Sequence, residues 1–90
     1  MNIHSDQLHA KLQTDLHPFF LQVEDESAAH AGHAGSDGSG QGTHFRVRIG
    51  AKTFEGISRV ARHRLVYDAL QQFTDQGLHA LAIEIVDAPN

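Results

Sequence analysis

The sequence contains no cysteine and no tryptophan, and only one tyrosine and two prolines, in 90 residues. Without cysteine the chain forms no disulfide framework, offers no thiolate nucleophile and supplies no all-thiolate metal or cluster site by itself. Its apolar runs are too short to span a bilayer, so we expect no membrane contact. The start, MNIHSDQLHAKL, lacks the basic and apolar stretches of an export signal, and we therefore expect a cytoplasmic protein.

Length and composition predict one domain over residues 1–90. A chain this short buries only roughly 60 to 65% of its unfolded surface, so it sustains a single core. The sequence is 40% hydrophobic and 20% charged, which is typical of an ordinary globular domain. Eight histidines are the most unusual feature of the composition, and they favour a metal or proton role because imidazole is the commonest metal ligand in proteins.

Charge is unevenly spread along the chain. The formal net charge of −4 argues against a general polyanion binder. Between residues 46 and 64, however, six basic residues face the single acid Glu55, which gives a local charge of +5. The six are Arg46, Arg48, Lys52, Arg59, Arg62 and Arg64. This segment is either an ordinary exposed face or a patch that meets phosphate or an acidic partner.

The first third of the chain predicts a helix and a strand. Three leucines at helical spacing follow Ser5, so we expect a helix from residue 5 to 16 with Ser5 as its cap. Pro18 should end this helix, because a residue before proline avoids helical geometry. The following FFLQVED alternates between more and less apolar positions and predicts a strand that ends near Asp25.

A glycine-rich segment, at about 26–43, separates this strand from the next one. It has no aliphatic side chain larger than alanine and cannot offset its ordering entropy, so we expect a flexible loop. Strict alternation resumes in HFRVRIGA, with Phe45, Val47 and Ile49 inward and His44 outward, in phase with the arginines. We expect this second strand to pair antiparallel with the first across the loop.

The last third of the chain is helical after Gly56, and we expect a short helix followed by a longer one. Ser58 is a candidate cap, and Gly77 followed by Leu78 fits a glycine stop. The stripe expected to face the core is Leu65, Val66, Ala69, Leu70 and Phe73. The final strand, at about 79–86, should return by a right-handed crossover and lie parallel in the sheet, which gives a small α+β fold.

Four stretches resemble the BolA family: DES with a following histidine at residues 25 to 30, THFRVRI at 43 to 49, FEG and ARHRLVYDAL between 54 and 70, and GLHALAI at 77 to 83. The resemblance implies a class II KH-like αββααβ fold, with a small three-stranded mixed sheet and helices packed on one face. It also implies a non-enzymatic adaptor or regulator that pairs with a monothiol glutaredoxin and shares a [2Fe-2S] cluster with it. Some members of the family are linked to transcriptional control.

The same resemblance implies two cluster ligands from this chain. One is the histidine of the HAL motif, which is His79 here. The other is a cysteine or histidine in the loop between the first two strands; with no cysteine present, His30 holds that position and His33 is a further candidate. The glutaredoxin side would supply a cysteine and a glutathione thiolate. The isolated chain is then expected to be a monomer or weak homodimer without a tightly bound cofactor.

Each histidine also has a plainer interpretation. His79 could be packed at a sheet edge, and His30 and His33 could be solvated loop residues. His44 is a third candidate for the loop ligand, and His63 is expected to hold the start of the long helix. A zinc site made of His30, His33 and His79 without a partner would lack a thiolate and a second shell, so we expect only weak binding there.

The alternative function is that of a DNA-binding regulator. It would contact phosphate, or an acidic partner, through the basic residues of the helix pair and of the second strand. These residues are Arg59, Arg62, Arg64, Arg46 and Arg48. A KH-like domain needs a glycine between its helices for close approach to nucleic acid, and SRVARHRL has none. No nucleophile lies beside a base in the sequence, so an enzyme is not expected.

Overall fold

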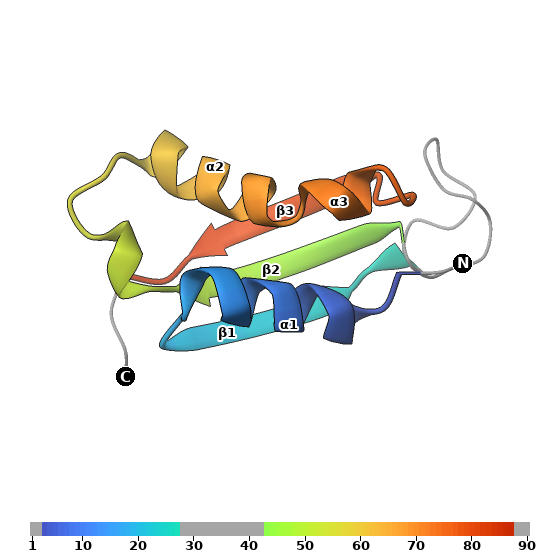
Figure 1. The fold of residues 1–90 in the computed structure, drawn as a ribbon, viewed down its shortest axis with the longest axis horizontal. Coiled ribbons are helices and arrows are strands. Elements are labelled where there is room, and N and C mark those ends of the chain that lie inside the picture. The colour runs from blue at the N-terminus through green and yellow to red at the C-terminus, as the bar shows by residue number, and fades with distance from the viewer. Residues whose placement is uncertain (1–2, 28–42, 88–90) are drawn as a thin grey trace.

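The structure is a computed structural model that describes residues 3–27 and 43–87. Its elements are α1 (Ser5–Leu16), β1 (Phe20–Asp25), β2 (His44–Gly50), the 3-10 helix η2 (Lys52–Phe54), α2 (Arg59–Ala69), α3 (Gln71–Thr74) and β3 (Ala80–Ile85). In the sheet, β2 is central, β1 pairs with it antiparallel and β3 pairs with it parallel (Figure 1). This order confirms the small α+β fold with a three-stranded mixed sheet.

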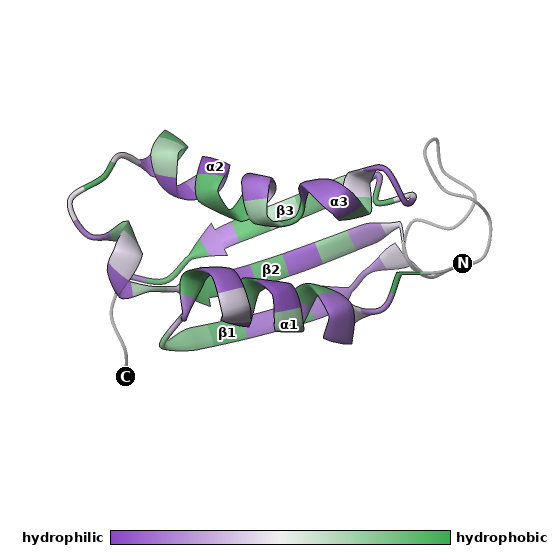
Figure 2. Ribbon diagram, viewed as in Figure 1, coloured by the Kyte–Doolittle hydropathy of each residue, from purple (hydrophilic) through white to green (hydrophobic). Residues whose placement is uncertain are grey.

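The core forms between one face of the sheet and the helices. Alternate residues of β2, from Phe45 to Ile49, are 2% exposed or less, whereas Arg46 and Arg48 between them are only half-buried. Figure 2 shows this alternation along β2 and the apolar side of α1. The other buried apolar residues are Ile3, Leu8, Leu12, Ala51, Phe54, Val66, Ala69, Leu70, Phe73 and Leu78. Each fully buried leucine or phenylalanine contributes about 2 kcal/mol by leaving water, so this face holds the helices in place.

The start of α1 differs from the prediction. Ser5 is the first helical residue and not the cap; His4 takes that position in extended conformation. The His4 backbone N–H donates to Gln7 Oε1 at 2.7 Å, and the Gln7 N–H donates to the His4 carbonyl at 2.9 Å. The glutamine side chain satisfies an N–H at the helix start, so a serine cap is not needed. The predicted range of the helix is confirmed: it ends at Leu16, and His17 is its C-cap before Pro18.

The sequence predicts a short helix followed by a longer one, but in the structure the longer helix α2 comes before the shorter helix α3. Ser58 caps the start of α2: Ser58 Oγ accepts the Ala61 N–H at 3.1 Å. Leu70 then leaves helical geometry, at φ −102° and ψ 10°, and the four-residue α3 follows. The predicted apolar stripe is confirmed, since four of its five residues are buried and Leu65 packs partly buried against them. No helix within residues 3–27 or 43–87 is long and apolar enough to cross a membrane.

Candidate functional site

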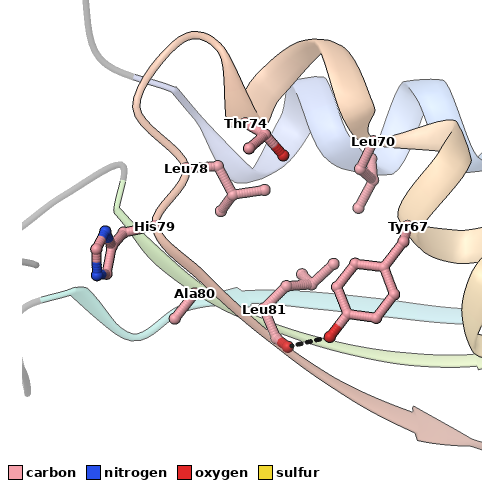
Figure 3. A pocket seen from close by; sticks show the side chains of 7 residues that line it. All are labelled: Tyr67, Leu70, Thr74, Leu78, His79, Ala80 and Leu81. Atoms are coloured by element: carbon pink, nitrogen blue, oxygen red, sulfur yellow. Dashed lines mark hydrogen bonds between the residues drawn. The ribbon is translucent and has the colours of Figure 1, made fainter.

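His79 lies at the start of β3, on backbone that is fixed by the neighbouring strand. The Thr43 carbonyl, just before β2, accepts the N–H groups of His79 at 2.8 Å and of Ala80 at 3.1 Å. The His79 side chain is exposed, and in Figure 3 it points away from Tyr67 and Leu81. The sheet therefore holds the backbone of this histidine and leaves its imidazole at the surface.

The turn before His79 explains why the residue lies there. Gly77 has φ +115°, a conformation that favours glycine, and its N–H donates to the Thr74 carbonyl at 3.4 Å. The Leu78 N–H donates to the Phe73 carbonyl at 2.9 Å, and the Leu78 side chain is buried. This is the Schellman arrangement that ends many helices, and it confirms the predicted glycine stop. Leu78 is buried, and the next residue, His79, is exposed just before β3 begins at Ala80.

Ser27 joins the two chain segments that flank residues 28–42. Its side chain is fully buried, and its Oγ accepts the N–H groups of Thr43 and His44, each at 2.9 Å. Its own N–H donates to Asp25 Oδ1 at 2.9 Å. Nothing in the sequence patterns pointed to Ser27 beyond its place in the DES motif. Its role depends on a hydroxyl that accepts hydrogen bonds from residues 16 and 17 positions away.

His44 is buried, although its position in the strand predicts an outward residue. Only 8% of it is exposed, because it lies among Ser27, Thr43 and His79. Its Nδ1 is 2.9 Å from Thr43 Oγ1, within hydrogen-bond distance. The centres of the His44 and His79 rings are 5.7 Å apart, with 46° between the ring planes. The fold thus brings together two histidines that are far apart in the sequence.

The two candidates for the loop ligand, His30 and His33, lie outside the described residues, so the assignment of that ligand stays a prediction. Among residues 3–27 and 43–87, no three histidine, cysteine, aspartate or glutamate side chains are arranged to hold a metal ion. His79 nevertheless offers the kind of donor that a shared cluster needs, because an exposed imidazole is open to a group carried by another protein.

The predicted basic residues divide between two places. Arg46 and Arg48 lie on the sheet and form ion pairs: Arg46 with Glu26 and Glu84, both at 2.9 Å, and Arg48 with Glu24 at 3.0 Å and Glu84 at 3.2 Å. Hydrogen bonds to Glu26 and Glu84 raise the pKa of Arg46. The hydrogen bond from Arg46, helped by the charge of Arg48, lowers the pKa of Glu84. These two guanidinium groups already have carboxylate partners.

On α2, Arg59 and Arg64 are exposed, whereas Arg62 donates to the Ile57 carbonyl and to Asp87. The two exposed arginines border a shallow cavity of about 440 Å³ that also includes Val60 and Tyr67. Val60 is 68% exposed and Tyr67 is 48% exposed. The sequence patterns do not predict this exposed apolar surface. Its only signal was an apolar residue at a polar position of the helix in RVARHRLVY.

A second cavity, of about 230 Å³, lies between α2, α3 and β3 and extends to His79 (Figure 3). Tyr67 lines both cavities, and its hydroxyl donates to the Leu81 carbonyl at 3.3 Å. The surface around His79 is therefore continuous with the exposed side of α2.

A family model described as "BolA-like protein" matches residues 12–88. The chain belongs to the BolA family. Among curated proteins of this family, "Protein BOLA1, chloroplastic" of Arabidopsis thaliana is 50% identical over 80 residues, which cover 88% of this chain and 50% of that protein. "SufE-like protein 1, chloroplastic/mitochondrial" of the same plant is also 50% identical over 80 residues, covering 86% of this chain and 22% of that protein.

The solved structure of BolA1 from Arabidopsis thaliana has a TM-score of 0.82 and 44% identity, with 99% of each chain covered. This likeness confirms the BolA fold expected from the four motifs. The chain spans half the length, or less, of the two Arabidopsis relatives. Because their names refer to chloroplasts and mitochondria, the cytoplasmic location stays a prediction.

Proposed function

We propose that this BolA-family chain is an adaptor that pairs with a monothiol glutaredoxin and co-ligates a [2Fe-2S] cluster through His79 and one histidine of the 28–42 segment, His30 or His33. The observation that supports it is the exposed imidazole of His79 on a backbone held by the Thr43 carbonyl. A rigid attachment with an accessible nitrogen suits a ligand for a group that another protein carries.

Ligation by imidazole has different chemical consequences from ligation by thiolate. When bound, a [2Fe-2S] cluster with imidazole in place of thiolate carries less negative charge and has a higher reduction potential. Only the neutral imidazole binds metal, so protonation of His79 competes with ligation. The partner's cysteine and a glutathione thiolate would complete the ligand set. Such mixed ligation suits cluster transfer or iron-linked regulation better than permanent storage.

The test is reconstitution of the pair with iron and sulfide, followed by visible circular dichroism of the complex. We expect His79→Ala to change or abolish the signal of the shared cluster. His9→Ala is the matched control, because His9 is an exposed histidine on α1, and it should leave the spectrum unchanged. If His79→Ala gives the wild-type spectrum, the ligand assignment is wrong.

The loop ligand needs its own pair of variants. We expect only one of His30→Ala and His33→Ala to change the spectrum as strongly as His79→Ala does. The double variant should behave like the more damaging single variant. A wild-type spectrum from the double variant would exclude both histidines as ligands.

A second candidate function is DNA binding through α2, and the exposure of Arg59 and Arg64 beside the cavity favours it. Arg46 and Arg48 are weaker candidates for phosphate contact, because they would have to leave Glu24, Glu26 and Glu84. Each lost phosphate contact should lower the slope of log affinity against log salt by about one. Arg59→Gln should show this loss and Lys11→Gln on α1 should not; no retention of duplex DNA at low salt would exclude the function.

A further inference from the structure

Among the described residues, the ring of His44 lies beside the exposed imidazole of His79. The ring centres are 5.7 Å apart, and His44 is only 8% exposed. An exposed side chain normally samples several rotamers, and it loses that freedom when it is fixed in a complex. A buried ring beside it removes some of those rotamers in advance.

His44 is itself held at its backbone and at its ring. Its N–H donates to Ser27 Oγ at 2.9 Å, and its carbonyl accepts the Glu26 N–H at 2.8 Å. Its Nδ1 lies 2.9 Å from Thr43 Oγ1. A ring fixed in this way restricts the orientations of the neighbouring His79 imidazole, whereas a mobile ring would not.

Thr43 and His44 together restrain both the backbone and the side chain of His79. The Thr43 carbonyl binds the His79 backbone N–H, and the Thr43 hydroxyl orients the ring that packs beside the His79 imidazole. Through Ser27 the same two residues also hold the point where the chain enters residues 28–42. One cluster of hydrogen bonds therefore fixes His79 and the two residues that flank the segment 28–42, Ser27 and Thr43.

We propose that His44 is a positioning residue for His79: its buried ring limits the orientations of the His79 imidazole before any partner arrives. The effect of His44 on cluster binding rests on the proposed function. Its effect on the orientation of the His79 ring in the isolated chain does not. His44 acts here through His79, and the iron is bound by the other histidines. Groups that orient a metal-binding histidine typically affect metal affinity by roughly tenfold to a hundredfold.

Four variants separate the parts of this arrangement. His44→Ala removes the ring, and His44→Phe keeps a flat ring without nitrogen atoms. Thr43→Val removes the hydroxyl that faces His44 Nδ1 and keeps the size of the side chain. Thr43→Ser keeps the hydroxyl and is its matched control. Far-UV circular dichroism identifies the variants that fold, and if His44→Ala does not fold, the Thr43 pair decides the question.

The first experiment uses the isolated chain and nuclear magnetic resonance. In the wild type we expect nuclear Overhauser contacts between the two imidazole rings and three-bond Hα–Hβ couplings of His79 that indicate one dominant rotamer. His44→Ala should average these couplings. Thr43→Val and His44→Phe both lack the contact between Thr43 Oγ1 and His44 Nδ1 but keep a ring at position 44, so they should average the couplings only in part, whereas Thr43→Ser should keep them close to wild type. Identical His79 couplings in the wild type and in the folded His44→Ala and Thr43→Val variants would overturn the positioning role.

The second experiment uses the complex with a cluster-loaded monothiol glutaredoxin. We expect His44→Ala to weaken cluster retention by roughly tenfold and His44→Phe to keep the wild-type visible spectrum. If His44→Phe loses the spectrum as completely as His79→Ala does, His44 is a ligand and the positioning role is wrong. If His79→Ala leaves the spectrum unchanged, the proposed function fails, while the rotamer result in the isolated chain still supports the contact between the rings.

Discussion

The two ends of β2 are closed by different kinds of contact. At the Gly50 end, backbone groups pair directly: the Phe19 N–H donates to the Gly50 carbonyl at 2.9 Å and the Val86 N–H to the Ile49 carbonyl at 2.8 Å. At the His44 end, the Ser27 hydroxyl accepts two backbone N–H groups. Backbone groups pair at the His44 end too, since the Glu26 N–H donates to the His44 carbonyl and the His79 N–H to the Thr43 carbonyl, each at 2.8 Å. The difference is that the Gly50 end is closely packed, whereas the His44 end adds a buried side-chain hydroxyl as an acceptor.

The difference has a consequence for function. Close packing at the Gly50 end leaves no room for a side chain, since a Cβ there would lie 2.6 Å from both Phe19 Cε1 and the Val86 carbonyl oxygen. The polar end can place an exposed imidazole beside a buried one because hydroxyl groups satisfy the nearby backbone. The contrast suggests that the first end serves stability and that the second end also serves the proposed ligand site.

The largest effect is expected from Gly50→Ala, which should lower the free energy of unfolding by about 3 kcal/mol through overpacking. Adding Phe19→Ala should recover only part of this loss, because the Val86 carbonyl belongs to the backbone and cannot rotate away. Gly56→Ala is the control: it meets nothing within 4 Å, and its φ of +77° should cost about 1 kcal/mol. Urea unfolding measures all three, and equal costs for the two glycine substitutions would contradict the packing argument.

Ser27→Ala should destabilise the His44 end of β2. It leaves the Thr43 and His44 N–H groups without their acceptor in a buried site, which should cost about 2 kcal/mol. Ser58→Ala is the matched control, because it also removes a hydroxyl acceptor but at an exposed helix start, where the loss should be about 1 kcal/mol. Hydrogen exchange of the Thr43 and His44 amides should accelerate only in Ser27→Ala. Unchanged exchange there would show that Ser27 does not hold the two segments together.

Combining Gly50→Ala with Ser27→Ala tests whether the two ends are independent. β2 has seven residues, so its ends are about 20 Å apart. Distant sites without shared partners should add to within about 0.5 kcal/mol. The free energies of unfolding of the two single variants and the double variant check this. A larger deviation would mean that β2 transmits strain from one end to the other.

The smallest effect on the free energy of unfolding is expected from Glu84→Gln, which removes a carboxylate from the ion pairs that lie on the sheet between the two ends of β2. Because the folded-state pKa of Glu84 is lowered, mainly by the hydrogen bond from Arg46, its contribution to stability is present above the ordinary glutamate pKa. It is lost as the pH falls through the lowered value. The stability difference between the wild type and Glu84→Gln should therefore shrink under acid, in unfolding experiments from about pH 7 to about pH 3. A constant difference would show that the ion pairs contribute nothing.

Local patterns predicted most of the fold. The leucine spacing gave the range of α1, the alternation from Phe45 to Ile49 gave the buried face of β2, and Gly77 with Leu78 gave the end of the helical region. Each signal lies within a few residues of the element that it predicts. The motifs of the BolA family pointed to the same fold, and the family match and the likeness to a solved BolA structure confirm it.

The predictions failed where distant residues decide the outcome. Alternation placed His44 outward, yet it is buried because Ser27, Thr43 and His79 meet around it. The order of helix lengths was also wrong, since an apolar stripe shows which face is buried and does not show where the helix breaks. Likewise, the closeness of six basic residues in the sequence left open whether they form a patch or an ordinary exposed face; in the structure, Arg46 and Arg48 bind carboxylates on the sheet.

The sequence by itself determined the secondary structure, the buried face of the sheet and the membership of the BolA family, because each depends on residue types at short, fixed spacings. Only the tertiary structure decided that His44 and His79 lie side by side and that Ser27 holds both flanks of residues 28–42. Those contacts join residues 16 to 35 positions apart. The Ser27 contacts arise from the antiparallel pairing of β1 with β2, and the contact between the histidines arises from the parallel pairing of β2 with β3 and from the turn that places His79 just before β3.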